Sequence, residues 1–380
     1  IISMKESQVQ NESCEEEKSG AEGERETFLM EFFKVPENLL SLSLEERKKA
    51  CRKLMKSTKS SDGFPKGSLT ESADISLFEE ALVVAFFSVI VGGPIISFFI
   101  GLYLFAYGYW LSWAKFMVAM AILAFHPIPK NYKGLIQSKF SLAVYKYFSF
   151  RMIIEDLEMS DQKNSAWVGA SGPHGVLPIA NIVSMLGINL FARPFVGGAA
   201  SVVLNTPFLR YMSLFGGMVD VSGKSLQKTT GEGVCVGIVP DGIAGMFKTG
   251  KDDEVVFLKK RMGLAKFALR TGVTVVPAYS IGNTKIFTPW FDSLGIMEFL
   301  SRRAKASFLV FWGRWYLPIP RRYNITLLCG KAIKVEKMRN EDIKDHHVQE
   351  VHARLLEGIK DIFDRHKGSV GWQQTQIRFI

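Results

Sequence analysis

The chain has 380 residues, of which 47% are hydrophobic, and its 47 Lys and Arg residues outnumber 37 Asp and Glu residues for a formal net charge of +10. This length allows one large domain with appendages, and the charge favours an anionic partner such as lipid headgroups, a phosphorylated co-substrate or nucleic acid. No zinc-finger or RNA-binding motif accompanies the charge, so nucleic acid is not expected as a partner. The four cysteines are widely scattered, which argues against a disulfide framework and against a metal cluster.

Residues 1–75 are predicted as a disordered or basic cytosolic N-terminal segment. Residues 1–28 hold almost no large apolar side chain before Phe28, so they cannot bury enough surface to offset the entropy cost of ordering. Residues 43–57 are predicted as a short basic helix that begins with a capping box, in which Ser43 is followed three residues later by Glu46. A solvated helix or linker is favoured here over a helix on the membrane surface.

Residues 77–128 are predicted as a membrane hairpin. No Asp, Glu, Lys or Arg occurs from Ala81 to Ala114, which exceeds the ~20 apolar residues that a spanning helix needs. Gly92-Gly93-Pro94 is expected to break this run, and a second apolar stretch follows Lys115. Two transmembrane helices and a re-entrant hairpin both remain open, because basic residues flank both ends and place both in the cytosol. A buried core helix is disfavoured at this length without charge.

Residues 129–380 are predicted as an α/β domain with a mixed sheet and flanking helices. Short apolar runs of β type alternate there with helical patterns, which is typical of crossover-connected strands. The predicted strands are 166–170, 234–239, 273–279 and 324–328, and the predicted helices are 177–186, 257–270 and 341–365. In such a sheet the loops at the carboxyl ends of the strands carry the chemistry.

The most informative short motif is Gly172-Pro173-His174-Gly175, which lies between a predicted strand and a predicted helix. This placement presents the imidazole at a strand end, beside helix N–H groups that could stabilise an oxyanion. A neutral His174 could take the proton from an alcohol as it attacks a thioester. Taken alone, the tripeptide is also typical of a plain turn.

The stretch from about Tyr147 to Trp372 resembles the type-2 diacylglycerol acyltransferases, a family that also includes monoacylglycerol and wax-alcohol acyltransferases. Besides residues 172–175, the resemblance rests on segments in the family's order and spacing: Asn-Thr-Pro-Phe-Leu-Arg at 205–210 with Gly216-Gly217, Ile-Val-Pro-Asp-Gly-Ile-Ala-Gly at 238–245, residues 261–272, and Val-Pro-Ala-Tyr-Ser-Ile-Gly-Asn at 276–283.

The resemblance implies an acyltransferase fold and acyl transfer from acyl-CoA to diacylglycerol, giving triacylglycerol, with acyl-CoA as co-substrate and no other cofactor or metal. It implies contact with membrane lipids at the endoplasmic reticulum, with lipid droplets as a second location, and it leaves homo-oligomerisation open. Monoacylglycerol or a wax alcohol is the alternative acceptor. A non-catalytic neutral-lipid-binding or lipid-droplet protein is the rival from another class.

The chain departs from the family's pattern at two places. The family commonly has His-Pro-His-Gly at the catalytic turn, and Gly172 replaces the first His, whereas the His taken as catalytic is present as His174. In the later loop, Asp241 replaces the first glycine of Pro-Gly-Gly, and Gly245 replaces a glutamate, which puts the family's carboxylate partner in doubt. Asp241 could orient His174 or could simply close its own turn. Backbone N–H groups near Gly175 or Gly242 are the candidate oxyanion donors.

Several other polar residues are weaker candidates. Arg261, Lys266 and Arg270 share one predicted helix and could contact the phosphates of coenzyme A, although a solvated helix face would show the same spacing. Asn283 could bind substrate, although an Asx turn is the favoured use. The histidines at 346, 347 and 352 lack the spacing of metal ligands and are expected to be solvated.

Overall fold

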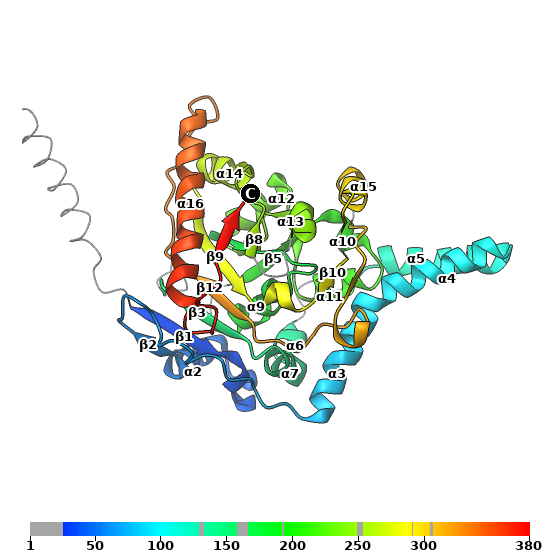
Figure 1. Cartoon of the computed structure of the whole chain (residues 1–380), viewed down its shortest axis with the longest axis horizontal. Helices are drawn as coiled ribbons and strands as arrows, with labels where there is room; N and C mark the ends of the chain where they lie inside the picture. Colours follow the sequence, from blue (N-terminus) through cyan, green and yellow to red (C-terminus); the bar gives the residue numbers. More distant parts are fainter. Residues whose placement is uncertain are drawn as a thin grey trace, which may run out of the picture.

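The computed structural model of the protein describes residues 26–128, 133–157, 166–191, 194–248, 254–290, 292–304 and 307–380. The disorder predicted for residues 1–28 therefore falls almost entirely outside the described residues. Figure 1 shows a central sheet with helices on its faces and a helical arm that projects from one side. The predicted mixed α/β architecture is confirmed.

A nine-stranded sheet in the order β2-β1-β3-β12-β9-β4-β7-β5-β6 forms the centre of the molecule. Strands β9, β4, β7, β5 and β6 are parallel, whereas β12 is antiparallel to β9 and β1 is antiparallel to β3. The strand bounds are β1 Thr27–Glu31, β2 Lys56–Thr58, β3 Arg151–Ile154, β4 Trp167–Gly172, β5 Phe195–Ala199, β6 Val219–Asp220, β7 Cys235–Ile238, β9 Thr274–Ile281 and β12 Thr326–Cys329. All four predicted strands are confirmed, with ends that shift by two residues or fewer.

The sheet begins earlier in the chain than the sequence indicated. Strand β1 lies between β2 and β3, so the two strands within residues 27–58 belong to the sheet that carries His174 and not to a separate segment. Its last residue, Glu31, pairs in register with the buried Arg151, whose Nε lies 3.5 Å from Glu31 Oε1. The side chains of β1 are buried on both faces, so its sequence shows no alternation of apolar and polar residues that would predict a strand.

Two layers of helices bury the faces of the sheet. One core cluster packs β-strands against α2, α7 and α9, and the other packs them against α12, α14 and α16. The bounds are α2 Leu44–Leu54, α6 Lys133–Ile136, α7 Lys139–Tyr147, α9 Ile179–Phe191, α10 Ser201–Asn205, α11 Leu209–Phe215, α12 Gly223–Gly231, α13 Gly242–Lys248, α14 Gly263–Thr271, α15 Ile296–Ala304 and α16 Asp345–His366. The predicted capping box of Ser43 and Glu46 is present at the start of α2.

Two small sheets lie outside the main one. Strand β10 (Thr288–Pro289) pairs with β11 (Phe311–Trp312), and β8 (Glu254–Val256) pairs with β13 (Ile377–Phe379). The helix predicted for 257–270 consequently starts later, at Gly263, because the residues before it follow β8 in a turn.

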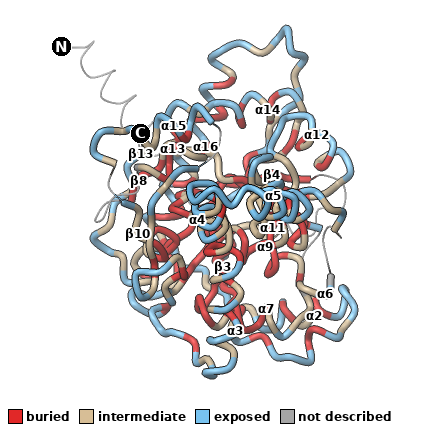
Figure 2. The backbone as a smooth tube through the Cα atoms, turned by 90° about the vertical axis from the view of Figure 1, so that its right-hand side faces the viewer, coloured by how far each residue is buried: buried red, intermediate tan, exposed pale blue. Residues whose placement is uncertain are grey.

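The predicted hairpin region is helical. Helix α3 (Leu77–Phe87), a π-helical turn (Ser88–Gly92) and α4 (Gly93–Ala106) form one continuous helix, the one described helix that is long and apolar enough to cross a membrane by length and composition. Helix α5 (Trp110–Phe125) returns beside α4, and the pair projects from the body of the protein (Figure 1). We call residues 77–125 the arm. Figure 2, which views this side of the molecule, shows that most of α4 and α5 is exposed.

The expected helix break at Gly92-Gly93-Pro94 does not occur. Pro94 lies in the first turn of α4, where a proline is tolerated, and the π-helical turn absorbs the irregularity before it. Gly93 instead makes room for a neighbour, since a Cβ there would lie 2.7 Å from Cγ of Phe208. These residues therefore allow close packing against the α/β domain.

Both ends of the helical arm are fixed to the same domain. At its start, Glu79 of α3 forms an ion pair of 2.6 Å with Lys146 of α7. At its end, the guanidinium of Arg210 donates to the carbonyls of His126 at 2.9 Å and Leu123 at 3.4 Å. The chain thus enters and leaves the arm at the same domain.

Candidate active site

The predicted catalytic turn lies at the carboxyl end of β4, in the middle of the sheet between β9 and β7. His174 is half-buried there, five residues before α9 begins. The chain that leaves the carboxyl end of β5, on the far side of β7, forms α10 and α11, and α11 contacts the π-helical turn at the base of the arm. The carboxyl ends of parallel strands all lie at one end of the sheet. His174 therefore lies at this end, which faces the arm and which we call the catalytic edge.

The imidazole of His174 is held in one tautomer by its own loop. Its Nδ1 lies 3.0 Å from the carbonyl oxygen of Gly175. A carbonyl oxygen can only accept, so the neutral ring that makes this bond carries its proton on Nδ1 and leaves a lone pair on Nε2. This arrangement suits a general base.

Asp241 contacts the main chain of the catalytic turn. It is fully buried between β7 and α13, and its Oδ2 accepts the backbone N–H of His174 at 2.9 Å. The sequence suggested that Asp241 could orient the ring, but this bond fixes the backbone instead. Burial raises the pKa of Asp241, although attraction to His174 and nearby backbone N–H groups offsets part of the rise. Its Oδ1 is buried without a hydrogen bond to any described residue.

Asn283 clamps the turn from the other side. Its Nδ2 donates to the carbonyls of Pro173 at 3.2 Å and His174 at 2.8 Å, and its Oδ1 accepts the N–H of Ala180 at 3.1 Å. Gly175 is needed beside it, because its φ is +60° and a Cβ there would lie 3.0 Å from Asn283 Nδ2. Asn283 is only 2% exposed, so its side chain holds the turn through structural contacts.

A buried carboxylate that no sequence pattern indicates lies behind the turn. Glu254 of β8 accepts hydrogen bonds from Tyr279 Oη at 2.6 Å and from Thr284 Oγ1 at 2.7 Å. Val256 on the same strand packs against the start of the turn, since a Cβ on Gly172 would lie 3.0 Å from its Cγ1. Because β8 is recognisable only through its pairing with β13, no local pattern could identify Glu254 as part of the site.

The expected oxyanion donors differ in availability. The N–H of Gly242 donates to the carbonyl of Val239 at 3.3 Å and so closes its own turn. The N–H of Gly175 makes no backbone hydrogen bond within the described ranges. Gly175 is therefore the better candidate of the two.

The three basic residues predicted for coenzyme A do not gather at His174. Lys266 and Arg270 are exposed on α14, and Arg261 lies before its first turn, over the ring of Phe257 at 5.3 Å. Helix α14 leads into Thr274, which is in register with Trp167 at the start of β4. Arg270 thus lies near the opposite edge of the sheet, roughly 16 Å from the catalytic edge by the rise of β4. Arg261, at the other end of α14, lies nearer to it.

The histidines of α16 occupy different environments. His346 is exposed, as expected, but His352 is buried and its Nε2 donates to the carbonyl of Lys259 at 3.2 Å. Position 352 falls on the face of α16 that packs on the domain, which explains the departure from the expected solvated position.

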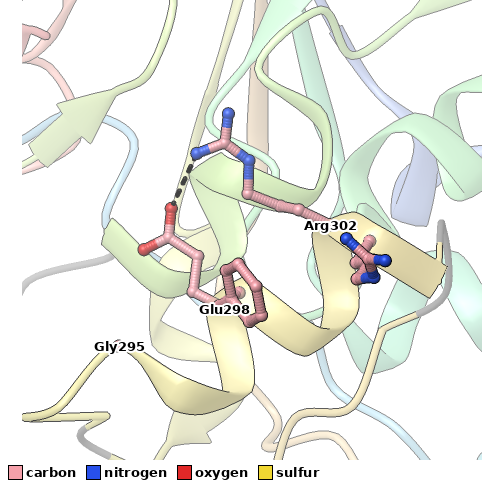
Figure 3. A pocket seen from close by; sticks show the side chains of 5 residues that line it. Gly295, Glu298 and Arg302 are labelled. Atoms are coloured by element: carbon pink, nitrogen blue, oxygen red, sulfur yellow. Dashed lines mark hydrogen bonds and ion pairs between the residues drawn. The ribbon is translucent and has the colours of Figure 1, made fainter.

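An open pocket of about 520 Å³ lies beside α15, which packs against α13. Its lining includes Phe299, Arg302 and Arg303, and Figure 3 shows Arg302 directed toward Glu298, with 3.4 Å between Nη1 and Oε1. Because α13 begins directly after Asp241, this pocket is one helix removed from the catalytic turn.

The chain is similar to known acyltransferases over much of its length. A family model described as diacylglycerol acyltransferase matches residues 103–379. Diacylglycerol O-acyltransferase 2-like protein 6 of Bos taurus is 26% identical over 260 residues, which cover 61% of this chain and 76% of that protein. Acyl-CoA wax alcohol acyltransferase 2 of Mus musculus is 29% identical over 186 residues, covering 45% and 54% of the two chains. Diacylglycerol O-acyltransferase 2 of Mus musculus is 27% identical over 200 residues, covering 49% and 50%.

One solved structure, the 1-acyl-sn-glycerophosphate acyltransferase PlsC from Thermotoga maritima, superposes with a TM-score of 0.38 and 13% identity over 75% of this chain and 97% of that one. That likeness is too low to support an argument. The family match is sufficient to define the class of protein, which is an acyltransferase. The chain belongs to the diacylglycerol acyltransferase family, among relatives of the type-2 enzymes, and the resemblance found in the sequence is confirmed.

Proposed function

We propose that this protein is a membrane-anchored enzyme that transfers the acyl group of acyl-CoA to diacylglycerol, with His174 as its general base. The single observation that supports this most is the bond from His174 Nδ1 to the Gly175 carbonyl, because it leaves Nε2 as a proton acceptor at the catalytic edge. The acceptor hydroxyl gives its proton to Nε2 while its oxygen attacks the thioester carbonyl. The tetrahedral intermediate then expels the thiolate of coenzyme A, which takes the proton from His174.

The exposed arm supports a membrane location. Large apolar side chains of α4 and α5 such as Phe98, Leu111 and Phe125 are exposed, which is costly in water. The 16 residues of α5 correspond to roughly 24 Å, less than the ~30 Å of a hydrocarbon core, whereas the continuous helix that ends in α4 has 30 residues. The short return helix favours the re-entrant hairpin over two full crossings. Both ends would then lie on the cytosolic face, at the endoplasmic reticulum or on lipid droplets.

The orientation of the site suits substrates of opposite solubility. Because the catalytic edge faces the arm, a neutral acceptor dissolved in the bilayer could reach His174 from the membrane side. Acyl-CoA would arrive from the cytosol, and Arg261 remains the proposed phosphate contact, since it lies at the end of α14 nearer to this edge. Charge reversal at Arg261 should raise the apparent KM for acyl-CoA and leave the dependence on diacylglycerol unchanged. The same reversal at Arg270 is the matched control.

A wax alcohol or monoacylglycerol is the second candidate acceptor, and the similarity to a wax alcohol acyltransferase favours keeping it. The test is acyl transfer from labelled acyl-CoA by solubilised protein, with diacylglycerol, monoacylglycerol and a fatty alcohol offered in parallel. His174→Ala is compared with wild type, and His346→Ala, at an exposed position of α16, serves as control. We expect triacylglycerol from wild type and control but none from His174→Ala. Activity that survives in His174→Ala would exclude the histidine mechanism, and inactivity with every acceptor would favour a lipid-binding protein.

A further inference from the structure

Large apolar side chains are also exposed outside the arm, along the excursion between β9 and β12. We call these residues the collar: Leu294, Ile296, Phe299, Leu300, Phe308, Val310, Trp315, Tyr316 and Leu317. They occur in one stretch of the chain that leaves the carboxyl end of β9, which is the catalytic edge of the sheet. A group of exposed apolar residues of this kind marks a surface that contacts something other than water.

The sharpest feature of the collar is a strained turn. Trp315 and Tyr316 have φ values of 54° and 59°, a left-handed conformation that bulky residues rarely adopt. The turn is closed by hydrogen bonds of 2.7 Å from the N–H of Gly313 to Leu317 O and from the N–H of Arg314 to Ile319 O. The two rings are nevertheless 61% and 85% exposed. Strain of this kind persists where the surrounding structure enforces it, and it clusters at functional sites.

The strained turn lies at the base of the arm. Arg314 forms an ion pair with Glu80 of α3, and its guanidinium stacks on the Trp315 ring at 4.2 Å from the ring centre. Pro318 approaches the π-helical turn, since a Cβ on Gly92 would lie 3.7 Å from its Cγ. The turn is therefore continuous with the surface that leads into the arm.

Helix α15 supplies the other half of the collar. Ser301 faces inward and is buried, whereas Ile296, Phe299 and Leu300 point outward. Arg302 and Arg303 follow at its end and are exposed. Figures 1 and 2 show α15 on the same side of the molecule as the arm. A short helix with an apolar outer face and terminal arginines matches the chemistry of a membrane interface, where guanidinium groups meet lipid phosphates.

We propose that the collar is a second membrane contact, in which the Trp315–Leu317 turn and the outer face of α15 enter the headgroup layer of the bilayer that holds the arm. This inference rests on the proposed membrane insertion of the arm. Trp and Tyr are the residues enriched at such interfaces, and Arg302 with Arg303 favours anionic lipid. An arm alone leaves the domain free to tilt, whereas a second contact holds the catalytic edge against the lipid surface.

Depth-dependent quenching in vesicles tests this proposal. The full chain carrying Cys14→Ser receives one fluorophore-labelled cysteine at Tyr316, Phe299, Arg270 or Phe105, and is reconstituted in phosphatidylcholine–phosphatidylserine vesicles with nitroxide lipids. Phe105 near the tip of the arm reports insertion of the arm, and exposed Arg270 at the opposite edge of the sheet is the negative control. We expect shallow nitroxides to quench the labels at 316 and 299 severalfold more than the label at 270.

Two results would overturn the proposal. If the labels at 316 and 299 are quenched no more than the label at 270 while the label at 105 is quenched, the arm inserts and the collar does not. If no label is quenched, membrane insertion of the arm fails as well.

A second measurement concerns charge: reversing Arg302 and Arg303 to Glu should reduce phosphatidylserine-dependent quenching at 299 severalfold. Reversing exposed Arg354 on α16 should not change it, and equal effects of the two reversals would contradict a specific contact.

Discussion

The carboxylate of Asp241 fills the space that a side chain at position 245 would need. A Cβ on Gly245 would lie 2.6 Å from Cγ of Asp241, and the N–H of Gly245 already donates to the Asp241 carbonyl at 3.3 Å. The two departures from the family's loop pattern are therefore one exchange. This chain places a carboxylate behind His174 from the strand end at 241, and it gives up the side chain at 245 to make room for it.

This exchange predicts strong coupling between the two positions. Gly245→Glu alone should lower the free energy of unfolding by about 1–3 kcal/mol, because the new side chain overlaps Asp241. Asp241→Gly alone should lose the anchor of the His174 backbone. The double variant should recover activity and thermal stability beyond the sum of the single effects, measured as a double-mutant cycle. Additive effects would show that the two positions do not share one volume.

The contact of Asp241 with the main chain predicts that Asp241→Asn keeps most of the turnover, since an amide oxygen can still accept the His174 N–H. Asp241→Ala should lower turnover at least tenfold. A loss of several orders of magnitude in Asp241→Asn would instead assign Asp241 to orienting the ring.

The raised pKa of Asp241 also predicts a pH dependence. The native state holds the proton more readily than the unfolded chain, so the free energy of unfolding falls as pH rises from the ordinary carboxyl range of about 4 through the raised pKa. Asp241→Asn removes this term, and its melting temperature should depend less on pH over that window than that of wild type. Thermal unfolding of both proteins in detergent across that range measures the difference. Parallel curves would argue against a buried, perturbed carboxyl.

The clamp of Asn283 predicts a loss of activity that exceeds its loss of stability. Asn283→Ala should reduce stability by about 3 kcal/mol, because it leaves buried carbonyl and N–H groups unpaired. Turnover per folded molecule should fall at least tenfold. Asn189 is a matched control, since its amide makes three bonds, to Met185 of α9 and to Phe195 of β5. Asn189→Ala should cost similar stability with little change in turnover, and equal activity of the two variants would refute a positioning role for Asn283.

The buried cysteines predict slow thiol chemistry. Burial raises the pKa of Cys51 to about 11 and that of Cys329 to about 12, so almost no reactive thiolate exists near neutral pH. Both should react with maleimide at least a hundredfold more slowly in native protein than in denaturant, as read by mass spectrometry. Rapid labelling of either residue in folded protein would contradict the packing around it.

The sequence was sufficient for those parts of the fold that local patterns encode. The four predicted strands are apolar runs, the Ser43–Glu46 cap is a local hydrogen-bond pattern, and the turn around His174 follows from Gly and Pro beside a strand end. These features depend on residues that are close in the chain, so their physical causes are visible without the structure.

The parts that the sequence did not reveal depend on contacts between distant segments. The contacts of Asn283 with the turn at His174 could not be predicted, because its three partners lie about a hundred residues away in the chain. Glu254 was missed because its strand exists only through pairing with β13. Gly93 was expected to end a helix, but the ring of Phe208 fixes its role. In each case the tertiary partner decides the role, and local propensity does not.

The pairing of β8 with β13 has a consequence for the order of events during synthesis. The arm emerges from the ribosome early, whereas residues 377–379, which flank the strand that supports the catalytic turn, emerge long after it. The support behind His174 therefore cannot be complete until translation has passed β13. If the arm inserts as proposed, the nascent chain meets the lipid surface before the support behind His174 is complete, so the proposed acyl transfer would begin only after the protein has reached its membrane.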